Sequence, residues 1–355
     1  PLALLRRLDS PRLEAILGCV LPTRTPNDGS ISGRVFPTRT PDDGSISQPA
    51  PGPLILDDAH QPAGPNLHQQ ACAATLSAVP VPERTDFGPS ISEIRALATS
   101  TGQPLPTQFR RIVVGEGRMP ETAVVAGRGF GTHPLVIQAH QVVYGDGRSI
   151  ILDVGCDEKT LTDNPSDLRI QPDNFARLQE AMRRADAIAL THEHFDHSSG
   201  IAHSPYFEEI APRVVMTDEQ LHGHQAELAG FTGDVPGRLK PLRYERMHLL
   251  RPGLVLIKAP GHTPGTQMLY VRLADGREFL LVGDIAWDQD NIRLPRMHPR
   301  LVNWLADEDG EAMANQLRYL HDLEKATPEL NLVVAHDAEQ MDGLIQRGLV
   351  QDGLR

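Results

Sequence analysis

The 355-residue sequence has few cysteines and no long apolar run. Cys19, Cys72 and Cys156 are far apart and odd in number, so they indicate neither a disulfide framework nor a CxxC zinc site. No run of about 18 apolar residues occurs, and the sequence therefore predicts no membrane span. We expect a soluble globular protein.

Basic charge is also scarce relative to acidic charge. The chain has 46 acidic and 34 basic residues, with a formal net charge of -12. Because nucleic-acid binding needs concentrated Lys and Arg, we expect no nucleic-acid partner. A chain of this length with 40% hydrophobic residues is long enough to bury a large core in one or two domains.

Residues 16–19 weakly resemble a bacterial lipoprotein cleavage site. The charged residues Asp9, Arg12 and Glu14 interrupt the apolar stretch that such a signal needs, so we reject a signal peptide. We expect a cytoplasmic protein. A periplasmic or secreted location stays open because the sequence has no initiator Met.

Residues 1–106 differ from the rest of the chain. They hold 16 of the 30 prolines, and segment 22–32 recurs at 37–47 with one change. Two polar copies are too few for a solenoid, which leads us to predict a flexible Pro/Gly/Ser-rich extension. A short helix at 90–99, with Ile91, Ile94 and Leu97 or Ala98 on one face, would dock on the folded body. An interaction tail and an inert extension both remain open.

Residues 107–355 predict one folded α/β domain. Strands are expected at 112–114, 122–125, 135–144, 149–154, 187–190 and 214–216, and helices at 173–184 and 218–228. The strands at 135–144 and 149–154 form a hairpin around Gly145-Asp146-Gly147. His222 and His224 lie in the second predicted helix, but residues two apart do not share a helix face, so we expect both to face solvent.

Four potential metal ligands fall within residues 191–197, directly after a predicted strand. The carboxyl ends of strands are where open α/β sheets place their sites. If the segment is extended, His192, His194 and Asp196 share one side and His197 turns to the other. The order His-x-His-x-Asp-His predicts metal binding, and one loop could serve two adjacent metals.

Three more predicted strands each lead to a potential ligand. The apolar runs 254–257, 279–282 and 332–335 are followed by His262, Asp284 and His336. Singly, each ligand could be a turn or cap residue. A sheet would instead collect all three at one edge, so together they predict a single site.

These residues resemble the ligand pattern of the metallo-β-lactamase-fold hydrolase superfamily. The resemblance covers about residues 109–340, and the intervals of 65 residues from His197 to His262 and 22 residues from His262 to Asp284 are ordinary for that family. It implies a four-layer αβ/βα sandwich, in which two sheets pack face to face with helices outside. The metal pair would lie at one edge.

The resemblance also implies two ligand groups. The first metal would be held by His192, His194 and His262, the second by Asp196, His197 and His336, and Asp284 would bridge them. Such ligands suit two zinc ions per chain, although iron and manganese also fit.

The implied chemistry is hydrolysis. Two divalent ions, two carboxylates and a bridging hydroxide leave a net charge of about +1, which lowers the pKa of bound water towards about 7 and polarises a carbonyl oxygen. We expect hydroxide attack on a carbonyl carbon. Asp196 or Asp284 would carry a proton to the leaving group.

Branches of the family differ at positions seen here. β-Lactamases with one cysteine ligand carry Cys where Asp284 stands, and nucleases usually add a domain or a basic surface. Glyoxalase II-like thioesterases need a basic clamp after the last ligand, where this chain has only about 19 residues. N-acyl-homoserine-lactone lactonases are most similar, but Trp287 stands where they carry Tyr. Trp287, Trp304 and Phe195 would either line an apolar pocket or belong to the core.

We therefore expect a zinc-dependent hydrolase of a small ester, most of all a lactone. The main alternative is a glyoxalase II-like thioesterase. A β-lactamase, a nuclease and a non-catalytic binding protein are less favoured. The sequence does not predict the oligomeric state.

Overall fold

The computed structural model describes residues 75–129, 131–163 and 167–355. The repeated segments at 22–32 and 37–47, together with Cys19 and Cys72, lie outside the described residues. Cys156 is a buried free thiol. None of the described helices combines the length and apolar character that crossing a membrane requires.

One sheet has seven strands in the order β12-β1-β2-β3-β5-β6, with β4 paired to β1. Its strands are β1 (Pro106–Pro120), β2 (Thr132–Tyr144), β3 (Ser149–Leu152), β4 (Arg169–Ile170), β5 (Ala187–Ala189), β6 (Val214–Val215) and β12 (Gln351–Asp352). The predicted hairpin is confirmed, because β2 and β3 pair in antiparallel fashion around Gly147, whose φ is 93°. β3, β5 and β6 are parallel, so their carboxyl ends share one edge.

The other sheet has five strands in the order β11-β10-β9-β8-β7. Its strands are β7 (Met247–Arg251), β8 (Leu254–Lys258), β9 (Gln267–Arg272), β10 (Glu278–Gly283) and β11 (Leu330–Val334). β8 and β10 are both antiparallel to β9, and β10 is parallel to β11. β8, β10 and β11 therefore end at one edge, as the sequence predicted.

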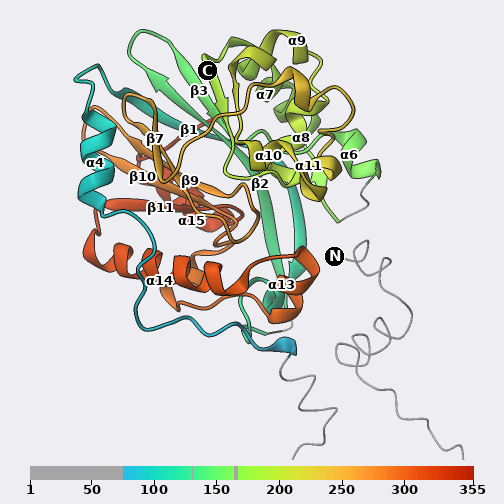
Figure 1. Cartoon of the computed structure of the whole chain (residues 1–355), viewed down its shortest axis with the longest axis vertical. Coiled ribbons are helices and arrows are strands. Elements are labelled where there is room, and N and C mark those ends of the chain that lie inside the picture. Colours follow the sequence, from blue (N-terminus) through green and yellow to red (C-terminus); the bar gives the residue numbers. More distant parts are fainter. Residues whose placement is uncertain (1–74, 130, 164–166) are drawn as a thin grey trace, which may run out of the picture. The chain divides into compact units, whose positions relative to one another are not determined.

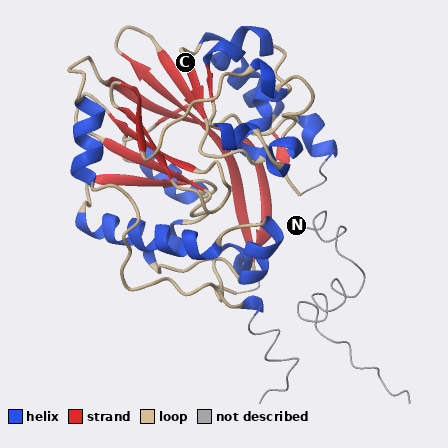
Figure 2. Cartoon of the chain, viewed as in Figure 1, coloured by secondary structure: helices blue, strands red, loops and turns tan. Residues whose placement is uncertain are grey.

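Helices cover the outer faces of both sheets (Figures 1 and 2). On the first sheet are α6 (Glu158–Asp163), α7 (Pro172–Arg184), α8 (Phe195–Ala202), α9 (Phe207–Ile210), α10 (Asp218–Leu221) and α11 (His224–Leu228). On the second are α4 (Ile91–Thr99), α12 (Gln289–Arg293) and α14 (Gly310–Ala326), while α13 (Arg300–Ala306) lies in the connection from α12 to α14. α5 (Glu121–Val124) lies between β1 and β2, and α15 (Ala338–Gln346) packs into the core between the sheets. Two short 3-10 helices span Ala211–Arg213 and Pro236–Arg238.

Three apolar layers separate these four structural layers. Along β8, Leu254 and Leu256 pack between the two sheets, whereas Val255 and Ile257 pack under the helices of the second sheet. A strand buried on both faces needs a continuous apolar run, which is the pattern that the sequence shows there. The predicted four-layer αβ/βα sandwich is confirmed.

Two predicted elements are wrong. Residues 122–125 were expected as a strand, but α5 forms there because Pro120 (φ -59°) begins a chain reversal closed by the bond from Glu121 N to Gly131 O. The single helix predicted at 218–228 is instead two short helices, α10 and α11. Gly223 separates them, because its φ of 105° is incompatible with a helix. His222 and His224 are exposed, as predicted.

The predicted helix at 90–99 is present as α4. Ser90 caps it in a capping box with Glu93, and its buried face includes Ile94 and Ala98. α4 contacts β7, β8 and β9, so it docks on the second sheet. Val79, Val81 and Phe87 pack on the same core. The folded body thus receives contacts from residues that precede 107.

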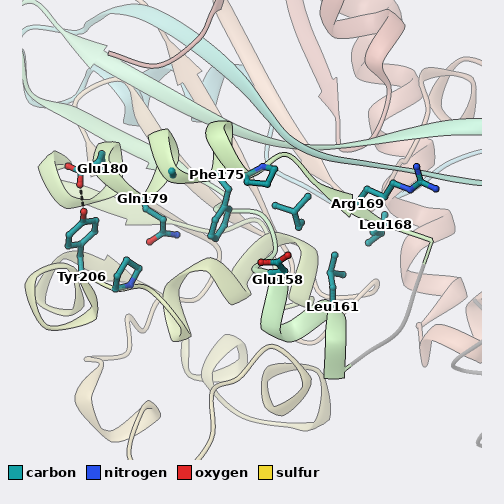
Figure 3. A pocket seen from close by; sticks show the side chains of 12 residues that line it. Glu158, Leu161, Leu168, Arg169, Phe175, Gln179, Glu180 and Tyr206 are labelled. Atoms are coloured by element: carbon teal, nitrogen blue, oxygen red, sulfur yellow. Dashed lines mark hydrogen bonds between the residues drawn. The ribbon is translucent and has the colours of Figure 1, made fainter.

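Two cavities lie away from the predicted ligands. One, of about 570 Å³, is lined by side chains of α6, β4 and α7 and by Tyr206, which contacts Glu180 (Figure 3). The second, of about 700 Å³, lies between β1, α7 and residues 352–355. Neither is lined by a predicted metal ligand.

Candidate metal centre

The second sheet delivers three of the seven predicted ligands. His262 follows β8, Asp284 follows β10 directly, and His336 follows β11. Because these strands end at one edge, side chains that are 74 positions apart meet there. The prediction that one sheet edge collects them is confirmed.

The other four ligands follow β5 of the first sheet. His192 and His194 lie in the loop after the strand, and α8 begins at Phe195, so Asp196 and His197 stand in a helical turn. The bond from His197 N to His194 O (3.0 Å) closes this turn. The extended arrangement expected from the sequence is therefore wrong: Asp196 shares a group with His197, not with His192.

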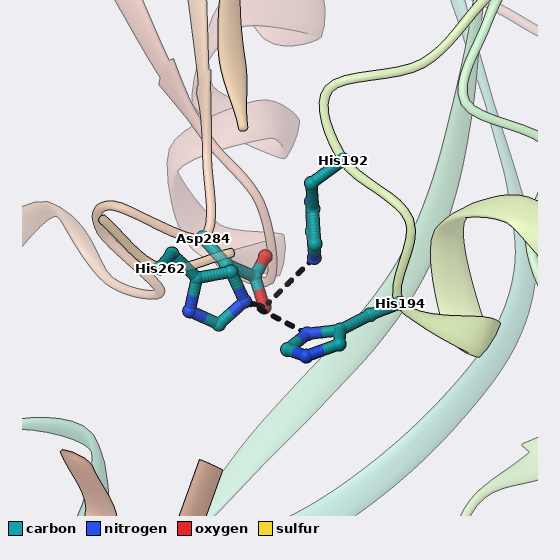
Figure 4. A group of neighbouring side chains, drawn as sticks. All are labelled: His192, His194, His262 and Asp284. Carbon is teal, nitrogen blue, oxygen red and sulfur yellow. Dashed lines mark hydrogen bonds and ion pairs between the residues drawn. The ribbon is translucent and has the colours of Figure 1, made fainter. Parts of the chain in front are cut away.

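The first group consists of His192, His194, His262 and Asp284, whose ligand atoms all lie within 4.8 Å of one another (Figure 4). Asp284 Oδ2 is 3.8 Å from His192 Nε2 and 3.4 Å from His262 Nε2. His194 turns Nδ1 inward, 2.8 Å from His262 Nε2. Three imidazoles thus converge on one carboxylate oxygen.

The second group consists of Asp196, His197 and His336. Asp196 Oδ2 lies 3.6 Å from His197 Nε2 and 3.7 Å from His336 Nε2. Asp284 Oδ1 is 3.2 Å from His197 Nε2 and 3.1 Å from His336 Nε2. His336 Nε2 is also 3.3 Å from Oδ2, so Asp284 lies between the two groups, with Oδ2 nearest to His192 and His262 and Oδ1 nearest to His197 and His336.

The histidine rings are held by hydrogen bonds on their far sides. Asp153 accepts from His197 Nδ1 (3.1 Å) and from the hydroxyl of Thr191 (2.9 Å). Since that hydroxyl donates to Asp153, it accepts from His192 Nδ1 (3.0 Å). His336 Nδ1 donates to the carbonyl oxygen of Val136 (2.9 Å). In each ring the second nitrogen, Nε2, faces the centre with its lone pair.

Burial and charge shape the electrostatics. Burial lowers the pKa of His192 well below its ordinary value, and burial with nearby His262 lowers the pKa of His194 to about 3. Burial opposes ionisation of Asp284, but the surrounding histidines hold its pKa well below its usual range. Burial also opposes charge on His197, His262 and His336, but the nearby carboxylates raise the pKa of each above its ordinary value. Because metal ions bind neutral imidazoles and ionised carboxylates, a cation would displace protons from these three rings.

Unsatisfied polar atoms fit a cation site. Within the described residues of this centre, His192 Nε2, His197 Nε2 and Asp284 Oδ1 are buried without a hydrogen-bond partner. Buried polar atoms are normally satisfied, and these three point to where a cation would bind. The imidazole and carboxylate donors suit zinc, iron or manganese.

Sequence reasoning missed two carboxylates that contact the ligands. Asp153 directly follows β3 and so repeats the pattern of a strand followed by a polar residue, which could have identified it. Glu308 accepts a hydrogen bond from His262 Nδ1 (2.6 Å), and nothing in its sequence surroundings marks it.

The aromatic side chains have different environments. Trp287 packs against Val124 and Val125 and lies 6.4 Å from the ring of His336. Phe195 packs against the core of the first sheet. Trp304 is 50% exposed, so it belongs neither to the core nor to a buried pocket wall.

The chain belongs to the metallo-β-lactamase superfamily. The sequence model described as "Metallo-beta-lactamase superfamily" matches residues 134–339, which contain every predicted ligand. No protein of curated function matches the sequence significantly.

Solved structures of two lactonases share this fold. A quorum-quenching N-acyl homoserine lactone lactonase is 17% identical, with a TM-score of 0.54 over 67% of this chain and 95% of its own. An N-acyl homoserine lactone hydrolase with N-hexanoyl-L-homoserine bound at its catalytic metal centre is 16% identical, with a TM-score of 0.54 over 67% of this chain and 96% of its own. A probable metal-dependent hydrolase from Staphylococcus aureus is 15% identical, with a TM-score of 0.50 over 66% of this chain and 91% of its own. At these identities the similarity concerns the fold.

Proposed function

We propose that the protein is a dinuclear metal-dependent hydrolase that opens a small ester, most of all a lactone. The observation that carries the proposal is the position of Asp284 between the two ligand groups, with Oδ2 nearest to His262 of one group and Oδ1 nearest to His197 of the other. One group would hold a metal through His192, His194 and His262, and the other through Asp196, His197 and His336. We propose zinc for both positions, with iron or manganese as alternatives.

When bound, the two cations would supply an activated water as nucleophile and polarise the carbonyl group. The residues around them fix the ligand rings and move the proton. The side chain of Asp196 is 16% exposed, whereas that of Asp284 is 5% exposed. Asp196 is therefore the better placed of the two carboxylates to deliver a proton to the leaving alcohol.

A lactone is favoured by the fold shared with N-acyl homoserine lactone lactonases, one of which holds a ring-opened product at its metal centre. Trp287 gives the site an apolar wall beside His336. Its indole Nε1 is buried without a hydrogen-bond partner, so it could donate to an oxygen of the substrate.

Metal analysis tests the centre. We expect about two metal ions per purified wild-type chain. Asp284→Ala should hold at most about one ion and lose at least about 100-fold in kcat/KM, because both groups lose a carboxylate oxygen. Asp146→Ala, which removes an exposed carboxylate from the turn between β2 and β3, is the matched control and should keep both ions. A folded wild-type chain that is active without metal would overturn the proposal.

A substrate panel tests the reaction. We expect higher kcat/KM for N-acyl homoserine lactones than for lactoyl thioesters or β-lactams, because the acyl chain can pack on the apolar wall at Trp287. The same metal-loaded preparation is used for all three. Faster turnover of the thioesters would favour the glyoxalase II-like alternative, and a chain that binds two metals without hydrolysing any of them would support a binding protein.

A further inference from the structure

Glu308 is a buried carboxylate on the loop between α13 and α14. Its side chain is 0% exposed and accepts three hydrogen bonds. The donors are His262 Nδ1 (2.6 Å) to Oε1, and His298 Nε2 (2.6 Å) and Asn303 Nδ2 (2.8 Å) to Oε2. Burying a carboxylate is costly unless such partners satisfy it, so this loop is built around the contact.

The contact determines which nitrogen of His262 faces the metal centre. An ionised carboxylate only accepts hydrogen bonds, so His262 carries its hydrogen on Nδ1. In the neutral ring Nε2 is then left with a lone pair, and it lies 3.4 Å from Asp284 Oδ2. The ring is thus held in the tautomer that binds a cation.

The backbone just before His262 is hydrogen-bonded to α14, the helix that follows Glu308. Asp309 N donates to Gly261 O (2.8 Å), and Gln316 Nε2 donates to Pro260 O (2.7 Å). A Cβ on Gly261 would lie 3.1 Å from Gln316 Nε2, so the turn approaches α14 closely. α14 therefore fixes the turn, while Glu308 fixes the ring.

The two groups differ in how they are held. Asp153 contacts His197 of the second group directly and reaches His192 of the first group through Thr191. Within the described part of the chain, the side-chain hydrogen bonds of Glu308 reach a single ligand, His262. A change at Glu308 should consequently act on one group alone.

We propose that Glu308 is a positioning residue that sets the affinity of the first ligand group for its cation, an inference that rests on the proposed metal centre. Removing an outer carboxylate partner of a metal-binding histidine typically weakens metal affinity by about 10- to 100-fold. We expect Glu308→Gln to weaken zinc binding to the first group by about that factor and to change the second by less than about threefold.

The experiment is zinc titration against a chromogenic chelator. His336→Ala removes a ligand of the second group and leaves the first group intact, so zinc affinity in this background reports the first group. Adding Glu308→Gln to this background should weaken zinc binding by the full factor of about 10 to 100. The His194→Ala background lacks a ligand of the first group. Adding Glu308→Gln to it should leave the measured zinc affinity almost unchanged.

Glu311→Gln is the matched control, because it removes an equal charge from the exposed first turn of α14. It should leave both affinities unchanged. A purely structural role for Glu308 would instead lower the unfolding midpoint of the metal-free chain and weaken both groups equally. If Glu308→Gln does not fold, Glu308→Asp replaces it. The side chain of Asp is one methylene shorter, so its carboxylate lies farther from His262, and we again expect weaker zinc binding to the first group.

Unchanged zinc affinity in folded Glu308→Gln would overturn the inference while leaving the proposed hydrolase intact. A wild-type chain that binds no zinc, iron or manganese would instead overturn the metal centre itself.

Discussion

At the residue scale, the centre depends on close backbone approach as well as on its ligands. Gly283, just before Asp284, has a φ of 57°, and a Cβ there would lie 2.9 Å from Thr191 Cβ. This glycine lets the end of β10 approach the loop that carries His192. Gly283 ends β10 of the second sheet and Thr191 follows β5 of the first, so the contact joins both sheets at the site.

Gly283→Ala should therefore disturb both the fold and the centre. We expect the free energy of unfolding to fall by about 1–3 kcal/mol, from the positive φ and the clash with Thr191, and metal content to fall as Asp284 shifts. Urea unfolding and elemental analysis measure the two effects. Gly276→Ala is the control, since its φ is 92° but no atom lies within 4 Å of the added Cβ. Equal metal loss in both variants would refute a role for the contact.

At the element scale, apolar pattern predicted most of the elements but not every backbone reversal. The strands before His262, Asp284 and His336 were found because both faces of each are buried, which gives continuous apolar runs. The predicted strand at 122–125 is wrong because β-branched Thr and Val favour strands locally, whereas the tertiary contacts of Val124 and Val125 with Trp287 favour the turn. Local preference lost to packing there.

α4 provides a test of element packing. Ile94 is 0% exposed against the second sheet, so Ile94→Ala should lower the free energy of unfolding by about 2–5 kcal/mol. Ile91→Ala, on a half-buried position of the same helix, should cost clearly less. Chemical denaturation of both variants gives the comparison. Similar small losses would mean that α4 contributes little to the stability of the sheet.

At the scale of the whole molecule, the centre lies where the two sheets meet. The first sheet contributes the loop after β5 and the carbonyl of Val136, and the second contributes His262, Asp284 and His336. Neither sheet alone supplies a complete ligand group. We expect metal binding and the packing of the sheets to be lost together on unfolding, so bound zinc should raise the unfolding midpoint.

Two truncations separate the N-terminal segments. Removing residues 1–74 should leave metal content and kcat/KM unchanged, because every contact described at the centre comes from residue 136 onwards. Removing residues 1–99 also deletes α4 and Phe87, so the unfolding midpoint should fall by several degrees. An inactive chain after the shorter deletion would show that residues 1–74 take part in function.

The sequence by itself determined the ligand types, their order and the strands that carry them, because ligand chemistry and apolar runs are local properties. The division of the ligands into two groups was implied by the family resemblance, but only the tertiary structure gives its cause: α8 begins at Phe195, which places Asp196 and His197 in one group and leaves His192 and His194 in the other. The tertiary structure alone also brought Glu308 to His262, across 46 positions of the chain. Such partners are set by the packing of distant segments, which no short stretch of sequence encodes.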